Sequence, residues 1–201
     1  MGKYFIAILL SLSIVPAASA NDREAAVCGI IQEPYMFWLW SSLAPAPDIN
    51  RVSHLKFVEP VEYQASDGKT LRGYKYLSND GNQHQVPAKG YVLMALGNAM
   101  ISDQIIGSLR EFSEKHYDVY IYDYRGYGNS EGKRRINAII EDYKELSMSL
   151  NQHYERKLLY GISVGGGVIL NVSGWGVEYV AAGFECSQCW VCECGGGGGV
   201  D

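Results

Sequence analysis

The stretch that decides the fold reads LLYGISVGGGVIL and runs from Leu158 to Leu170. Its first part is apolar and ends at a glycine, which is the pattern of a short buried strand. The glycine-opened apolar run after Ser163 is expected to be helical. A strand that turns directly into a helix at Gly-x-Ser-x-Gly places the serine on a sharp, exposed turn. The stretch therefore raises the hypothesis that Ser163 is a catalytic nucleophile.

The residues around Ser163 favour this hypothesis. Gly161 and Gly165 stand where a larger side chain would clash in a tight turn. A helix that begins at Val164 would place backbone N–H groups beside the serine, where negative charge develops during acyl transfer. The five-residue pattern alone is weak evidence, and the alternative is a glycine-rich turn with an incidental serine. The strand before it and the helix after it make the nucleophile the preferred interpretation.

The sequence upstream alternates between strand and helix patterns. An Asp-Gly turn between two alternating runs predicts a hairpin, and apolar runs bounded by glycine predict buried strands. Such alternation builds an α/β fold, with a mostly parallel sheet and helices on both faces. The expected elements are hairpin strands over 55–66 and 71–77, a strand over 91–96, a helix capped by Ser102 with an apolar face of Ile105, Ile106, Leu109 and Phe112, a strand over 117–124, a helix over 135–152 and a strand over 157–162.

These elements carry three motifs: ALGNAM at 95–100, DYRGYGNSEG at 123–132 and GISVGGG at 161–167. Together they resemble the α/β-hydrolase fold family, nearest its serine aminopeptidase-like and Bem46-like branch. The resemblance extends from about Phe57 to Val172, which makes residues 55–172 a partial α/β-hydrolase domain. It implies a serine hydrolase that acts on a small-molecule ester or a peptide, as esterases, lipases and peptidases do.

The resemblance also implies roles for individual residues. Ser163 would attack a carbonyl carbon and form an acyl-enzyme. The backbone N–H groups of Val164 and Asn98 would form the oxyanion hole. Leu96 stands where the family usually has a histidine, and a backbone donor at Asn98 tolerates that change.

The loop motif at 123–132 is expected to be structural rather than catalytic. Arg125 can bridge neighbouring loops through two-pronged hydrogen bonds, and Asp123 is expected to help anchor it. Gly126 and Gly128 allow tight backbone turns near the candidate site.

A serine nucleophile needs a histidine base and usually an acid that orients it. In this family the chain order is serine, then acid, then histidine. Here every histidine precedes Ser163, and the topology predicts that His116 and His153 lie at the opposite edge of the sheet. We therefore expect little or no turnover from the chain as given. The histidines are His54, His84, His116 and His153, and the acids after Ser163 are Glu178, Glu185, Glu193 and Asp201.

The pattern is lost from Ser173 onward, and residues 173–201 form a tail rich in glycine and cysteine. We interpret the chain as a truncated or frameshifted hydrolase. The alternative is a non-enzymatic protein whose cysteine tail binds something. Thiolates spaced as here can bind zinc or an iron–sulfur cluster, but export favours disulfides instead, so no metal or cofactor is predicted. The tail cysteines are Cys186, Cys189, Cys192 and Cys194.

The N-terminus resembles an export signal. Lys3 precedes an apolar run over 5–15, and the small residues before Asn21 predict cleavage after Ala20. The expected location is secreted or periplasmic. An uncleaved membrane anchor remains as an alternative, and lipidation at Cys28 is a weaker one.

Composition restricts the remaining possibilities. The chain has 201 residues, enough for one domain, and a formal net charge of -5. Without a basic excess, nucleic acid is excluded as a partner. Residues 21–54 are aromatic and expected to be irregular, and EPYMFWLW within them could brace the domain or stay with a membrane.

Overall fold

The computed structural model describes residues 23–82 and 84–173, and its centre is one five-stranded sheet. The strand order is β1-β2-β4-β3-β5. The hairpin β1–β2 is antiparallel, whereas β3 runs parallel to both β4 and β5. This mixed, mostly parallel sheet confirms the predicted α/β class. The strands are β1 (Val58–Gln64), β2 (Thr70–Tyr76), β3 (Gly90–Ala95), β4 (Tyr117–Tyr122) and β5 (Lys157–Gly161).

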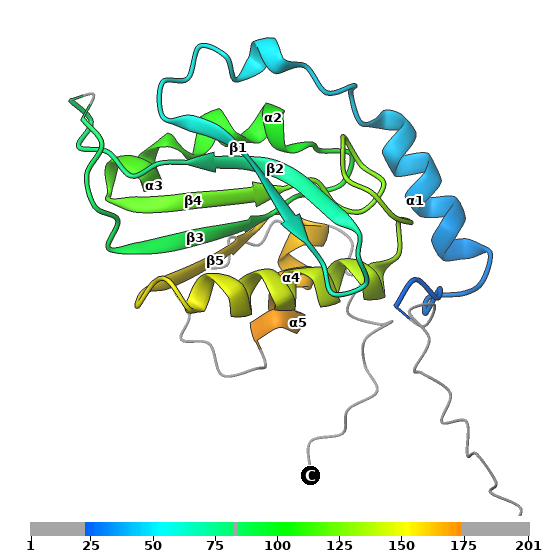
Figure 1. Cartoon of the computed structure of the whole chain (residues 1–201). Coiled ribbons are helices and arrows are strands. Elements are labelled where there is room, and N and C mark those ends of the chain that lie inside the picture. Colours follow the sequence, from blue (N-terminus) through cyan, green and yellow to red (C-terminus); the bar gives the residue numbers. More distant parts are fainter. Residues whose placement is uncertain (1–22, 83, 174–201) are drawn as a thin grey trace, which may run out of the picture.

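Helices cover both faces of the sheet (Figure 1). The short helices α2 and α3 lie on one face, and α4 and α5 lie on the other, packed against each other. The apolar side of α4 predicted from its spacing is buried against the sheet, where Tyr143 and Leu146 are almost inaccessible. Their bounds are α2 (Ser102–Ile105), a 3₁₀ turn (Ile106–Leu109), α3 (Arg110–Glu114), α4 (Ile136–Asn151) and α5 (Val164–Ser173).

The helix after β3 differs from the prediction. It is interrupted by the 3₁₀ turn, and Ser102 is its first helical residue rather than its cap. The N-cap position belongs to Ile101, whose side chain makes no capping bond. Instead the Ser102 N–H donates to Asp123 Oδ1 at 2.6 Å. The Ser102 cap prediction is wrong because a carboxylate from the end of β4 satisfies this helix end.

The expectation that residues 21–54 are irregular is also wrong in part. Residues Gln32–Leu43 form helix α1, and Ile49–Arg51 form a 3₁₀ turn. Phe37 of α1 is buried in the core, and the half-buried Trp40 packs edge-on against it with ring centroids 5.4 Å apart. This segment therefore braces the domain, one of the two alternatives that the sequence left open.

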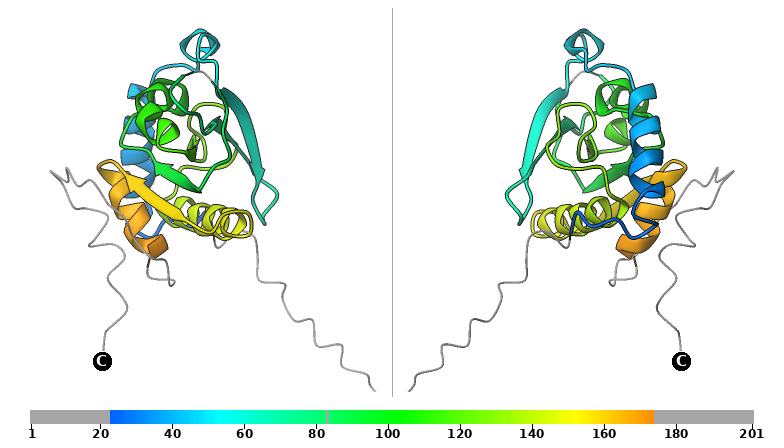
Figure 2. Two further views of the ribbon diagram at one scale, coloured as in Figure 1. Left: turned by 90° about the vertical axis from the view of Figure 1, so that its left-hand side faces the viewer. Right: turned by 90° about the vertical axis from the view of Figure 1, so that its right-hand side faces the viewer.

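Contacts at both ends of α1 define where it lies. At its start, Glu33 Oε1 accepts the N–H of Ile136, the first residue of α4. Beyond its end, Asp48 N and Arg51 both bond to Asp103 in the first turn of α2. Because α2 follows β3 and α4 follows β4, both anchor points lie at the carboxyl edge of the parallel strands. Helix α1 therefore crosses that edge, as the views in Figures 1 and 2 show.

Two further predictions fall outside the described residues, namely the leader over 1–20 and the cysteine cluster of the tail. Within 23–82 and 84–173, no helix is long and apolar enough to cross a bilayer. The same ranges contain no group of histidine, cysteine and acidic side chains arranged to hold a metal ion.

Candidate active site

Ser163 occupies a sharp turn between the end of β5 and the start of α5. Its backbone φ is 54°, in the left-handed region that non-glycine residues rarely adopt. The turn is closed by hydrogen bonds from Gly165 N to Ile162 O and from Gly166 N to Ser163 O, both 2.9 Å. Such strain costs about 1–3 kcal/mol and persists where the surroundings enforce it. The serine side chain is only half-buried, so a reactant can reach it.

The glycines on either side of Ser163 are required by contact. A Cβ at Gly161 would lie 2.7 Å from Gly166 N and closer still to the Gly165 carbonyl. A Cβ at Gly165 would lie 2.6 Å from Leu96 O and would overlap the Ala95 carbonyl. The turn therefore sits directly on the end of β3, and only glycine allows that approach.

The loop from β3 to α2 lies beside this turn. Ala95 pairs with Gly161 in the sheet, and Ile162 N donates to Ala95 O at 3.2 Å. In the described part of the chain, neither the Asn98 N–H nor the Val164 N–H donates a hydrogen bond. The Asn98 side-chain oxygen is buried there without a partner. The loop that carries Asn98 and the turn that carries Val164 are thus neighbours, and both N–H groups are unpaired among the described residues.

Two tyrosines that the sequence analysis missed hold the ends of these strands. The Tyr124 hydroxyl donates to Leu96 O at 2.7 Å, and the Tyr143 hydroxyl donates to Met94 O at 2.9 Å. Burial raises the pKa of both hydroxyls well above the ordinary value, so they remain donors at any working pH. Tyr124 ends the strand pattern over 117–124 and Tyr143 lies on the apolar side of the helix over 135–152, and these patterns alone predict core packing rather than a hydrogen bond.

Asp123 supports the loop in a way that differs from the prediction. Its carboxylate accepts Ser102 N at 2.6 Å and Asn129 N at 3.4 Å. Burial raises the pKa of Asp123 in spite of these bonds. A Cβ at Gly128 would lie 2.6 Å from the Asp123 carboxyl carbon, which explains this glycine. No hydrogen bond or ion pair recorded among the described residues joins Asp123 to Arg125, so the expected anchoring of the arginine by Asp123 is wrong.

Arg125 is fully buried between acids from other segments. Its guanidinium makes a two-pronged pair with Asp142 at 2.6 and 2.7 Å and a second with Asp67 at 2.5 and 2.9 Å. Glu24 adds a longer contact at 3.3 Å. Gly126, with a φ of 70°, makes the turn that follows. Arg125 thus joins the loop after β4 to α4, the hairpin turn and the N-terminal segment.

Comparisons with known proteins identify the fold. Residues 86–182 match a family described as serine aminopeptidase, S33. The chain also superposes on a Penicillium α/β hydrolase, GrgF, with a TM-score of 0.53 and 24% identity over 62% of this chain and 46% of that one. The chain is an α/β-hydrolase-fold protein.

Two further proteins are similar to the chain. The Pyrococcus furiosus esterase Pf2001 has a TM-score of 0.52 and 20% identity, covering 69% of this chain and 54% of its own. An uncharacterized Escherichia coli protein, YfhR, is 30% identical over 123 residues, which are 59% of this chain and 42% of YfhR. This hydrolase-fold chain therefore spans less than half the length of the curated relatives that it matches.

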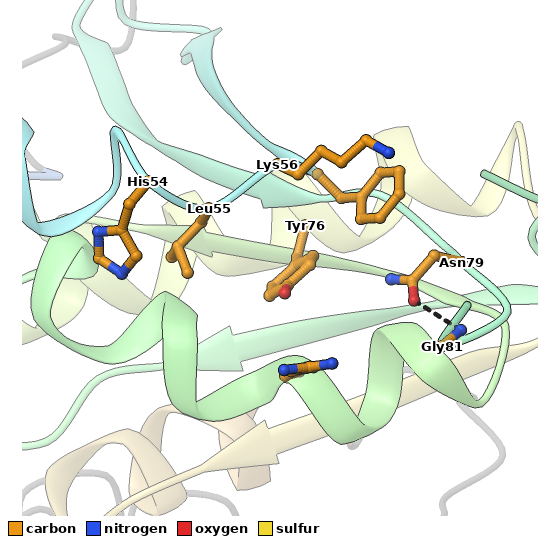
Figure 3. Close-up of a pocket in the computed structure, with 8 residues that line it drawn as sticks. His54, Leu55, Lys56, Tyr76, Asn79 and Gly81 are labelled. Carbon is orange, nitrogen blue, oxygen red and sulfur yellow. Dashed lines mark hydrogen bonds between the residues drawn. The ribbon is translucent and has the colours of Figure 1, made fainter. Parts of the chain in front are cut away.

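The histidines of this hydrolase-fold chain lie away from Ser163. His84, His116 and His153 lie within the six residues before β3, β4 and β5, respectively, and all three are exposed. Ser163 follows β5, whose 5 residues span about 16 Å. His54 lies with Asn79 and Arg110, residues near the starts of the parallel strands (Figure 3). Among the described residues, no histidine therefore shares the carboxyl edge with the serine.

The pocket in Figure 3 also belongs to the amino edge. It has a volume of about 440 Å³ and is separated from Ser163 by the length of the strands. Its cationic side chains are exposed, and Arg110 is already paired with Glu114 at 2.6 Å. It is lined by His54, Leu55, Lys56, Phe57, Tyr76, Asn79, Gly81 and Arg110.

Proposed function

We propose that Ser163 is the nucleophile of a serine hydrolase that cleaves an ester or related acyl bond of a small molecule or peptide. The observation that carries this proposal is the strained turn at Ser163 beside two unpaired backbone donors. In the reaction the Ser163 hydroxyl adds to the carbonyl carbon, and the N–H groups of Asn98 and Val164 bind the resulting oxyanion. The leaving group departs, and water hydrolyses the acyl-enzyme.

The proton of the serine hydroxyl must go to a base. No histidine of the described residues lies at this edge, so the proposed nucleophile has candidate oxyanion donors but no histidine base within the described part of the chain. We therefore propose that the chain as given turns over little or no substrate. A missing proton acceptor makes the proposal testable, because a base can be supplied from solution.

The experiment measures hydrolysis of p-nitrophenyl acetate by the full chain at increasing imidazole concentration. Imidazole hydrolyses this ester by itself, so the signal is the difference between the wild-type chain and Ser163→Ala. We expect almost no difference without imidazole and a growing one as imidazole is added. Ser53→Ala removes an exposed serine elsewhere and should behave as wild type. A fluorophosphonate probe, which labels only activated serines, should leave the wild-type chain nearly unlabelled.

Two results would contradict these proposals in different ways. If imidazole produces no difference between wild type and Ser163→Ala, Ser163 is not a nucleophile and the chain is a non-enzymatic protein. If the probe labels the chain strongly without imidazole and Ser163→Ala abolishes the label, the serine is activated and the proposed inactivity is wrong.

A further inference from the structure

The exposed apolar side chains of the described residues gather in one segment. Of the 9 large hydrophobic residues that are exposed, 7 lie between Val27 and Ile49. Three of them lie on one side of α1 and its N-cap residue: Ile31, Tyr35 and Trp38, with 77%, 56% and 57% of their surfaces accessible. They are spaced by four and three residues, so they form one stripe along the helix, which we call the outer face of α1. The Tyr35 and Trp38 rings lie 6.0 Å apart within it.

Helix α1 is thus apolar on two sides. Phe37 and Trp40 face the core of the domain, while the outer face points away from it. The single charged residue of α1, Glu33, is buried, and its carboxylate accepts N–H groups from Val27, Cys28 and Ile136. A helix that is apolar all round is stable only when both sides are covered. The body of the protein covers one side, and the outer face needs another partner.

When the leader stays uncleaved, the chain upstream indicates what that partner is. Arg23 is fixed to the body through ion pairs with Asp142 at 2.9 Å and Glu145 at 2.8 Å. The apolar run over 5–15 ends just before residues 16–22, which can reach about 25 Å when extended. The two acids that hold Arg23 belong to α4, and α1 also begins beside α4. A bilayer that takes up the apolar run therefore lies within reach of α1. Tyrosine and tryptophan are also the side chains that favour the boundary between lipid and water.

We propose that the outer face of α1 docks on the surface of a lipid bilayer, with Ile31, Tyr35 and Trp38 at the level of the headgroups. The helix is about 18 Å long at 12 residues, and it would lie in the plane of the membrane. Because α1 exposes no charged side chain, the docking is apolar, and zwitterionic lipids suffice. This interaction does not depend on the proposed reaction, but it would turn the edge that holds Ser163 toward the membrane.

The test follows the fluorescence of Trp38 in the full chain. Vesicles of phosphatidylcholine with brominated acyl chains quench tryptophans that enter the headgroup boundary, and the Trp38 signal is the difference between wild type and Trp38→Phe. We expect the vesicles to quench this signal in the wild-type chain. In the double variant Ile31→Glu with Tyr35→Glu, the quenching should be at least twofold weaker. The milder pair Ile31→Ser/Tyr35→Ser guards against misfolding. Met148→Glu charges an exposed apolar residue of α4 (57% accessible) and should leave the quenching unchanged.

The leader by itself could bring the chain to vesicles. The difference signal reports on Trp38 only, so it distinguishes docking of α1 from binding through the leader. The proposal fails if the chain floats with vesicles while the Trp38 signal stays unquenched, or if the glutamate pair leaves the quenching intact. A blue shift of Trp38 that grows with protein concentration without lipid would assign the outer face to a second copy of the chain instead. Adding anionic lipid should change little, and strong dependence on it would contradict apolar docking. None of these signals depends on Ser163 labelling.

Discussion

Ser163 holds an unfavourable backbone angle because its neighbours leave the turn no alternative. The glycines at 161 and 165 let the turn approach the end of β3 until backbone contacts backbone. The same approach places the loop that carries Asn98 next to Val164. The geometry of the candidate oxyanion hole therefore depends on the absence of two methyl groups.

Gly165→Ala tests this dependence. Its Cβ would overlap the Ala95 carbonyl and lie 2.6 Å from Leu96 O, so β3 and α5 must separate. We expect a loss of about 1–3 kcal/mol in the free energy of unfolding, measured in urea, together with loss of imidazole-dependent hydrolysis. Gly107→Ala is the control, since its Cβ meets only the Leu55 side chain at 3.5 Å. Equal stability of the two variants would refute the packing argument.

The need for glycine at 161 and 165 was predictable from the sequence, because a clash within a tight turn involves only residues close together in the chain. The sequence did not predict that Tyr124 holds the Leu96 carbonyl or that Asp123 holds the N–H of Ser102. Each of these bonds joins segments more than twenty residues apart, and nothing in either segment's own pattern indicates its partner.

At the scale of elements, the strands and α4 were predictable because one repeating pattern describes each. Helix α1 was not, because apolar residues on two sides leave no helical period to detect. The helix after β3 was predicted as continuous, but it breaks at a 3₁₀ turn. The position of α1 at the carboxyl edge of the sheet is set by contacts of this segment with α2 and α4. The residues of α1 alone do not predict those contacts.

Two neighbouring residues of α1 test its attachment. Phe37→Ala removes a ring that is 5% accessible, whereas Trp38→Ala removes one that is 57% accessible. We expect the first to lower the free energy of unfolding by about 3–5 kcal/mol and the second to change it by less than about 0.5 kcal/mol. Chemical denaturation measures both. Similar losses for the two would mean that α1 packs on the body through a different side.

The whole molecule is tied together around Arg125. Its partners come from the N-terminal segment, the hairpin turn and α4. The sequence predicted the bridging arginine but not its partners, for they are spread over more than a hundred residues. The positions of His116 and His153, in contrast, were predictable. The chain order of strands and helices alone places them at the edge of the sheet opposite Ser163.

The pH dependence of stability reports on this network. Burial would raise the pKa of Asp67, but the hydrogen bond and charge of Arg125 outweigh it, and the pKa is lowered from 3.8. A lowered acid pKa contributes stability above the unfolded value, and this contribution is lost as pH falls through the folded value. Asp67→Asn should therefore cost about 1.5–3 kcal/mol at pH 7, and the difference from wild type should shrink below about pH 4.

Urea unfolding of both proteins between pH 3 and pH 7 measures this difference. Glu155→Gln, an exposed acid, should give a flat difference near zero over the same range. A deficit of Asp67→Asn that persists unchanged at pH 3 would show that the carboxylate charge is not what binds the arginine.

The docking of Arg23 has a consequence for the predicted removal of the leader over residues 1–20. Its side chain is 11% accessible and paired with two acids, and Glu24 next to it accepts Lys133 N at 2.8 Å. A peptidase that cuts after Ala20 must hold the residues around the bond in an extended form. Only two residues, Asn21 and Asp22, separate that bond from the docked arginine. For the predicted cleavage after Ala20, we therefore expect removal of the leader to precede completion of the fold, and a chain that folds first to keep its leader.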